Sequence, residues 1–424
     1  MLPNSRLILP MLTAVFCVAV CTGCSTTSHS NSNSNPLWIA SSNDQMIRSY
    51  TIDNSGSITA VGSGDGVTAG LQPSSIVLSP DRITLFVANS GDNTISLYTL
   101  DSNQSSLTSA GPPVPAGNMP VALTADPAYN LLFVADKGSD SIMVFAITPG
   151  VLTLKTSFAI ETPPAAGGSG PVALAISPAG FSCIDNRAPV PVTQKCFALY
   201  AANQTSGTVT AYDYFVDSGG NFIRGSIDLN GNFIVGGPVA GSPYTVGASP
   251  AAIGFSRCAG AGAAITTCQS AGVNGLFVAN SGSDDITVFS ACIQLPTCQF
   301  GESSPDGTLT QVGSPVPVGA TGPTILLVNP VADFVYAVDT GSNQISELQF
   351  ASSTGTLTPL GATSPGASQI LSAAITTNVA STSQNWVVLT SVGTASVFSI
   401  GSDGSLTSSS QASISGQPSA MLIE

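Results

Sequence analysis

Residues 73–100 of the chain are PSSIVLSPDRITLFVANSGDNTISLYTL. This stretch holds three short apolar runs, 75–78, 84–88 and 94–100, which are separated by Ser-Pro-Asp and by Asn-Ser-Gly-Asp-Asn. Short runs rich in Val, Ile, Phe and Tyr between such turn clusters predict antiparallel strands.

The unit recurs along the chain. Its second strand has the pattern aromatic–aliphatic–small–Asn/Asp, with copies that begin at Phe86, Phe133, Tyr200, Phe277 and Tyr336 and weaker ones at Trp38 and Val387. A repeat of about 47 residues with several strands per copy is typical of propeller blades. Blades stack face to face, so that charged residues are excluded from their strands, and only 8% of the residues are charged. We therefore expect an all-β fold, a seven-bladed β-propeller of four-stranded antiparallel blades.

The two ends of the repeat array fit together. The first copy lacks an opening strand, while Gln-Pro-Ser-Ala-Met-Leu-Ile at 417–423 parallels Gln-Pro-Ser-Ser-Ile-Val-Leu at 72–78. We therefore expect the C-terminal strand to insert in the N-terminal blade and to close the ring.

Residues 1–24 are predicted to be an export signal. One arginine precedes a mostly apolar run over 7–20, which is too short to cross a bilayer comfortably. The ending Cys-Thr-Gly-Cys resembles a bacterial lipobox and would make Cys24 the lipid-modified first residue; a plain secretory signal and a retained anchor are the alternatives. Residues 25–35 form a flexible Ser/Asn tether, and 36–424 are expected to form a single propeller domain. These features predict an exported protein in the outer membrane, the periplasm or at the cell surface.

The net charge of −14, from 23 acidic and 9 basic residues, limits the partners. There are too few Lys and Arg residues to neutralise phosphates, so we expect no nucleic acid. We expect a monomer that contacts a membrane only through its lipid anchor.

Long insertions fall within 179–306 and carry six of the nine cysteines. Six cysteines allow fifteen pairings, but each neighbouring pair sits inside one loop, and an exported chain permits disulfides. The simplest pairing is Cys183–Cys196, Cys258–Cys268 and Cys292–Cys298. We predict no metal site at these cysteines, because there is no CxxC pair and the only histidine, His29, lies in the tether. Two interpretations of the insertions stay open, a binding surface and neutral loop growth.

The turns after the second strands are rich in Asn and Asp. They could bind a sugar, or a divalent cation such as calcium, through oxygen ligands; alternatively, these side chains bond the turn backbone. No other cofactor is expected. The possible ligand-facing residues are Asp44, Asn89, Asp92, Asp136, Asp140, Asn203, Asn280, Asp284 and Asp339.

Seven copies, the Ser-Pro-Asp turn, the Phe-Val-Ala-Asn strand and the segment GTLTQVGSP at 307–315 together resemble the lactonase-like seven-bladed propellers, relatives of 6-phosphogluconolactonase that overlap with YVTN-type repeats. The resemblance covers about 36–424 and implies lactone chemistry by His, Arg and Glu groups around a central channel. No such set can be matched in this sequence, so we predict no catalytic residues.

The sequence thus favours a binding module at the cell envelope, for a protein partner or a carbohydrate, that is not an enzyme. The alternative is a lactonase-like hydrolase that acts on a sugar lactone in the central channel. A purely structural envelope protein is the third hypothesis.

Overall fold

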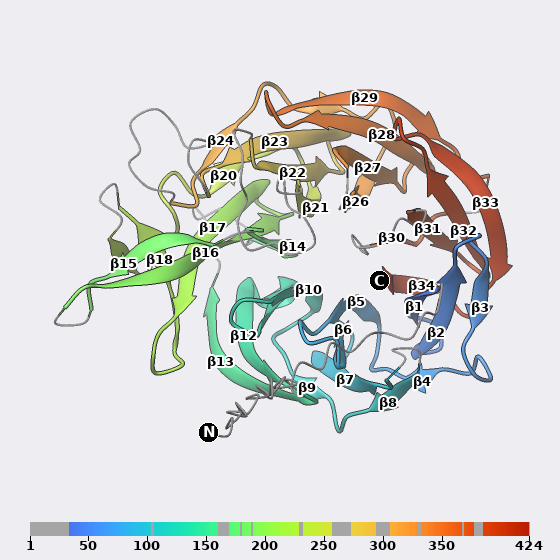
Figure 1. Ribbon diagram of the computed structural model, residues 1–424, viewed down its shortest axis with the longest axis horizontal. Coiled ribbons are helices and arrows are strands. Elements are labelled where there is room, and N and C mark those ends of the chain that lie inside the picture. The colour runs from blue at the N-terminus through green and yellow to red at the C-terminus, as the bar shows by residue number, and fades with distance from the viewer. Residues whose placement is uncertain are drawn as a thin grey trace, which may run out of the picture. The chain divides into compact units, whose positions relative to one another are not determined.

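The apolar runs of the repeat form the strands of seven antiparallel sheets in the computed structural model (Figure 1). The structure describes residues 34–102, 106–159, 169–178, 180–187, 190–228, 232–256, 273–293, 306–329, 332–366, 369–376 and 385–423. Each sheet is one blade, and we number the blades 1 to 7 along the chain.

In the first three blades the strands follow one another from the centre outward. Blade 1 consists of β34 (Pro418–Ile423), β1 (Ser34–Ser41), β2 (Met46–Asp53) and β3 (Ile58–Ala60). Blade 2 consists of β5 (Pro73–Leu78), β6 (Thr84–Asn89), β7 (Thr94–Leu100) and β8 (Leu107–Ser109). Blade 3 consists of β10 (Pro120–Asp126), β11 (Leu131–Asp136), β12 (Ser141–Thr148) and β13 (Val151–Ala159).

Blades 4 to 7 repeat this order. Blade 4 has β14 (Pro171–Ile176), β16 (Val192–Asn203), β17 (Thr208–Val216) and β18 (Phe222–Ile227), with β15 (Phe181–Asp185) and β19 (Phe233–Val235) added. Blade 5 has β21 (Pro250–Phe255), β22 (Gly275–Asn280), β23 (Asp285–Ala291) and β24 (Leu309–Gln311). Blade 6 has β26 (Pro323–Val328), β27 (Phe334–Asp339), β28 (Gln344–Ala351) and β29 (Thr356–Thr363). Blade 7 has β30 (Ser372–Ile375), β31 (Trp386–Ser391), β32 (Thr394–Ile400) and β33 (Leu406–Ser413).

Four two-residue strands pair with the third strands of their blades, namely β4 (Val67–Thr68), β9 (Val114–Pro115), β20 (Tyr244–Thr245) and β25 (Val316–Pro317). The one helix within the described ranges is the 3₁₀ turn η1 (Lys137–Ser139). No helix among those residues is long and apolar enough to cross a membrane.

The C-terminal strand closes the ring as the sequence predicts. β34 pairs antiparallel with β1, from Leu37 opposite Ile423 to Ala40 opposite Ala420. On its two sides β34 contacts β5 of blade 2 and β30 of blade 7, and each of the other innermost strands contacts the next in the same way. The fold is therefore an all-β propeller of seven antiparallel blades with a continuous inner wall.

The core is divided among the blade interfaces. Each of seven apolar clusters draws its buried side chains from two neighbouring blades. In β6, Phe86 packs toward blade 3 while Val87 packs toward blade 1. Because both faces are covered, all six residues of this strand are buried, which explains its continuous apolar pattern.

The inserted residues of blade 4 were expected to be loops, but the structure shows strands there. Residues 181–185 form β15, which pairs with the outer half of β16, and β18 pairs with β19. A bridge between Ile184 and Asn232 joins β15 to the β19 end. The strands β15 to β19 are here called the wing; they share one sheet with blade 4, and β15 and β18 project from the ring at the left of Figure 1.

Candidate functional site

Five of the predicted ligand-facing residues are the last residues of second strands and are completely buried. In Asn89 the side-chain oxygen accepts the Gly70 N–H at 3.1 Å. Its Nδ2 donates to Thr94 Oγ1 at 3.0 Å and to Ser96 Oγ at 2.9 Å. The side chain therefore joins the second strand, the third strand and the loop that enters the first strand.

The equivalent residues have the same setting, with an exposed fraction of 0% at Asn89, Asp136, Asn203, Asn280 and Asp339. The expectation that these five face a ligand is corrected by their burial. Where the residue is aspartate, burial has an electrostatic consequence: it raises the pKa of Asp136 to about 7 and that of Asp339 to about 6.

The other four, Asp44, Asp92, Asp140 and Asp284, lie at the surface of the turns and bind groups of the protein itself. Asp44 pairs with Arg48 at 2.6 Å, and Asp92 accepts the Leu71 N–H at 3.1 Å. Asp140 and Asp284 have φ angles of 50° and 56°, which Asp tolerates better than most residues. Asp140 accepts the Gly170 N–H at 2.6 Å, and Asp284 accepts the Gly322 N–H at 2.8 Å. Both bonds reach the entry of the next blade, so these turns hold neighbouring blades together.

The inner wall of the ring has few side chains that could act in catalysis. The seven innermost strands contain a single ionisable residue, Asp126, which is completely buried. Its Oδ1 accepts the Ala128 N–H at 2.7 Å. Glu347 lies instead in a third strand, where Oε1 accepts Thr363 Oγ1 at 2.7 Å and the Leu406 N–H at 3.1 Å. Within the described residues no three His, Cys, Asp or Glu side chains gather as a metal centre.

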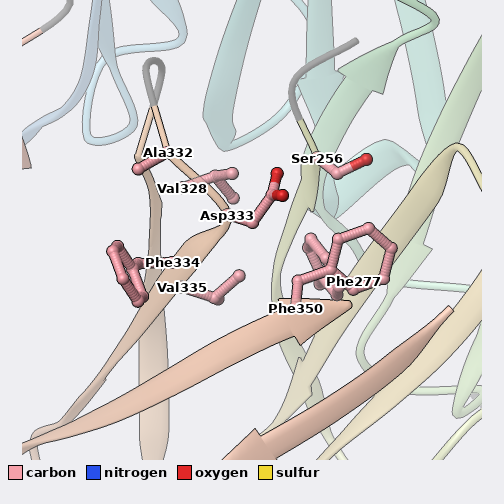
Figure 2. A pocket seen from close by; sticks show the side chains of 8 residues that line it. All are labelled: Ser256, Phe277, Val328, Ala332, Asp333, Phe334, Val335 and Phe350. Carbon is pink, nitrogen blue, oxygen red and sulfur yellow. The ribbon is translucent and has the colours of Figure 1, made fainter. Parts of the chain in front are cut away.

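A pocket between blades 5 and 6 is mainly apolar (Figure 2). Phe277, Phe350 and Val328 form its walls, with Ser256 and Asp333 at one side. Ser256 Oγ already accepts the Gly275 N–H at 2.9 Å. This bond ties Ser256, which follows β21, to the first residue of β22.

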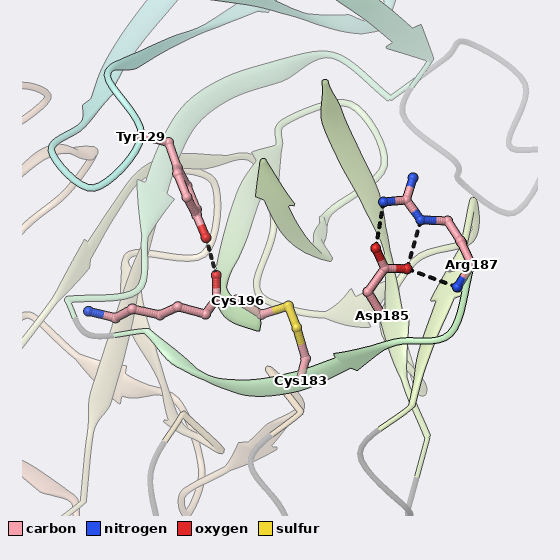
Figure 3. Close-up of a disulfide and its surroundings, with 6 residues drawn as sticks. Tyr129, Cys183, Asp185, Arg187 and Cys196 are labelled. Atoms are coloured by element: carbon pink, nitrogen blue, oxygen red, sulfur yellow. Dashed lines mark hydrogen bonds and ion pairs between the residues drawn. A yellow bond between two sulfur atoms is a disulfide. The ribbon is translucent and has the colours of Figure 1, made fainter. Parts of the chain in front are cut away.

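The wing is held by a disulfide between Cys183 and Cys196, which joins β15 to β16 (Figure 3). Cys292 is disulfide-bonded as well. Three cysteines of the predicted pairs, Cys258, Cys268 and Cys298, lie outside the described residues, as do Cys24 and residues 1–33.

An ion pair stands beside the disulfide in the wing (Figure 3). Arg187 binds Asp185 with two side-chain hydrogen bonds of 2.8 Å and keeps the pKa of this carboxyl below its usual range. The Tyr129 hydroxyl, from blade 3, donates to the Lys195 carbonyl. The wing is thereby tied to the neighbouring blade.

Several cations of this sector lie over aromatic rings. Arg224 stands 4.5 Å from the ring centre of Phe158 and 5.0 Å from that of Tyr212. Arg187 lies 5.2 Å from Phe215, and Lys195 lies 5.2 Å from Phe197. Such contacts favour the charged side chains at the edge of an apolar core.

Outside its core, the wing exposes branched aliphatic side chains. The exposed fractions are 72% at Val190, 45% at Val192, 54% at Ile234 and 55% at Val235. Sequence reasoning singled out the insertions but not these four residues, because β19 is buried at Phe233 and exposed at both Ile234 and Val235, a pattern that follows from neither strand nor helix periodicity.

Comparisons with known proteins agree with this architecture. Residues 29–166 match the family described as Lactonase, 7-bladed beta-propeller. A candidate 6-phosphogluconolactonase of Bacteroides uniformis is 15% identical with a TM-score of 0.65, covering 92% of this chain and 100% of its own. This chain has the fold of a seven-bladed β-propeller, as these proteins do.

Other solved structures share this propeller fold. The periplasmic gluconolactonase of Pseudomonas aeruginosa is 16% identical, with a TM-score of 0.65, and 92% of this chain covers 99% of that one. A protein of Lactobacillus plantarum gives 16% identity and a TM-score of 0.61 over the same shares of the two chains. No curated protein matches the sequence. At these identities the likeness concerns the fold.

Proposed function

We propose that this propeller is an exported binding module that contacts a protein partner through the wing. The observation that carries the proposal is the exposure of four aliphatic side chains, Val190, Val192, Ile234 and Val235, on segments of the wing. Exposed apolar side chains that gather on a soluble protein mark interaction surfaces. A disulfide across β15 and β16 keeps this surface preorganised, which lowers the entropy lost on binding.

The chemistry of the wing favours a protein over a carbohydrate. Three of its aromatic rings are turned inward: Phe181, Phe215 and Phe233 have exposed fractions of 4%, 0% and 6%. A sugar would need accessible rings and hydrogen-bonding groups, whereas aliphatic side chains fit a partner's apolar surface. The ring then serves as a rigid support.

Export to the periplasm or the cell surface is part of the proposal. The disulfides favour an oxidising compartment, and the Pseudomonas aeruginosa neighbour is periplasmic. We further propose a lipid anchor at Cys24. Palmitate labelling of the wild type and not of Cys24→Ala tests it, and equal labelling of both would refute the anchor.

The double change Ile234→Ser with Val235→Ser tests the wing surface. We expect crosslinked capture of the partner from envelope extracts to fall at least about tenfold, because two apolar contacts are lost without a change in the core. The melting temperature should stay close to that of the wild type.

Val392→Ser is the matched control, since Val392 is 63% exposed in blade 7, away from the wing. This variant should capture the same partner as the wild type. Equal capture by both variants would contradict a contact through the wing.

The second candidate function is hydrolysis of a sugar lactone, which the family match over 29–166 and the named neighbours favour. Incubation of the purified protein with a panel of sugar lactones tests it. Turnover that is lost on Asp→Asn changes at Asp44, Asp92 or Asp284 would establish a hydrolase whose site lies at the turns after the second strands. No turnover with any lactone would count against this candidate.

A further inference from the structure

A fully buried carboxylate lies between blades 4 and 5. Asp213 is in β17 and has an exposed fraction of 0%. Neither of its two side-chain oxygens has a hydrogen-bond partner. The other buried aspartates with an unpartnered oxygen, Asp126, Asp136 and Asp339, each have their second oxygen bonded. Among the described residues, Asp213 is therefore the one buried aspartate with both side-chain oxygens unpartnered.

The groups that face Asp213 are oxygen-rich. Gly307 of blade 5 lies directly on the carboxylate, since a Cβ at this glycine would stand 2.3 Å from Asp213 Oδ1. The Gly307 carbonyl accepts the Tyr200 hydroxyl at 2.8 Å. The preceding residue, Asp306, is 7% exposed, and its Oδ1 accepts Thr308 Oγ1 at 2.7 Å. The Thr308 N–H donates to the same oxygen at 3.1 Å.

The electrostatics of this cluster are unfavourable without a counter-charge. Burial raises the pKa of Asp213 well above its usual range, and the charge of Asp306 raises it further. The nearby Ile227 backbone acts in the opposite direction and lowers this pKa. Burial also raises the pKa of Asp306, and both carboxylates help to raise that of Tyr200. Two buried acids that interact electrostatically can be stabilised by protons or by a cation.

We propose that Asp213 and Asp306 bind a calcium ion at the interface of blades 4 and 5. The carboxylate oxygens and backbone carbonyls are the hard ligands that calcium takes, six to eight at a time and with flexible geometry. Magnesium fits less well, because it demands a near-ideal octahedron and retains several waters. The ion would join the third strand of blade 4 to the entry of the fourth strand of blade 5, in the sector that also carries the wing.

Calcium titration of the EDTA-treated protein tests the site. We expect calcium to raise the melting temperature by several degrees and magnesium to raise it less, since an ion that binds only the folded state stabilises it. Asp213→Asn should abolish the calcium effect, and in EDTA it should melt above the wild type because the buried charge is gone. Asp126→Asn is the matched control, a buried aspartate changed in the same way, and should keep the calcium effect.

A second measurement uses terbium in place of calcium. Tyrosine-sensitised terbium emission should appear in the wild type, fall several-fold in Tyr200→Phe and be displaced by calcium. Asp306→Asn, which keeps the bond to Thr308, should weaken calcium binding at least about tenfold. This variant keeps the test decisive if Asp213→Asn does not fold.

The proposal is overturned if calcium does not raise the melting temperature of the wild type, which would mean that Asp213 is buried as a neutral acid. It is also overturned if Asp213→Asn retains the full calcium effect, because the ion would then bind elsewhere. Neither result would bear on the proposed contact through the wing, because that contact is tested separately by capture of the partner.

Discussion

A chain that ends at Gly416 is expected to lose its cooperative fold. Without β34, the strand β1 has no inner neighbour, and the contacts of β34 with β5 and β30 are lost as well. Ile423 and Ala420, which are 0% and 7% exposed, belong to two different interface clusters. The missing side chains are worth about 5 kcal/mol or more, a large part of the stability of an ordinary domain.

Thermal unfolding followed by circular dichroism, together with size-exclusion chromatography, measures this loss. We expect the truncated chain to aggregate through the open edge of β1. Removal of Glu424 alone is the control and should leave the melting temperature unchanged. A truncated chain that melts within a few degrees of the full-length protein would show that the ring does not depend on its last strand.

The closure of the ring could be predicted because the sequence repeats. Gln417–Ile423 matches Gln72–Leu78 residue for residue in pattern. Since Gln72–Leu78 leads into the innermost strand of its blade, the matching segment is expected to supply the innermost strand of another blade. The apolar runs were located well for the same reason: a strand covered on both faces needs a continuous apolar segment.

The strand-end asparagines and aspartates show where sequence reasoning stops. Asn89 and Asp92 are three residues apart and of similar polarity, yet one is buried and the other is exposed. The difference depends on which side chain points back into the blade to meet Ser96, and this is a property of the paired third strand. Asp213 was overlooked for a related reason, because its unpartnered oxygens become evident only when blade 5 is packed against it.

The wing was only half predictable. Spacing of Cys183 and Cys196 indicated the bridge that the structure contains. That the enclosed residues form β15 and the outer part of β16 did not follow, since Val192–Cys196 alternates weakly and has no turn signal of the repeat.

The Asp136→Asn change is expected to stabilise the protein at neutral and alkaline pH. Burial raises the pKa of Asp136 from 3.8 to about 7 in the folded chain, so folding favours the protonated form. The stabilisation from this proton is complete below pH 4 and is lost as the pH rises through 7. A pKa difference of about three corresponds to at most about 4 kcal/mol, and we expect a gain of about 2–4 kcal/mol for the variant at pH 8.

Asparagine suits this position because three other blades already have it there, as Asn89, Asn203 and Asn280. The variant keeps the oxygen that accepts the Gly117 N–H, while its amide replaces the unpartnered Oδ2. Denaturant unfolding at pH 4 and at pH 8 measures the effect, and the variant and the wild type should agree at pH 4. A wild type that is as stable as the variant at both values would mean that Asp136 is not a raised-pKa acid.

Asp53→Asn provides a control of opposite sign. Asp53 is at the surface, and hydrogen bonds from Ser55 and Ser57 lower its pKa. Its stabilising contribution is present above pH 4 and is lost as the pH falls through the lowered pKa, so this change should weaken the protein slightly at pH 8. Both variants introduce the same amide group. If they change the free energy of unfolding in opposite directions, the effect at Asp136 must come from burial of its charge and not from the amide.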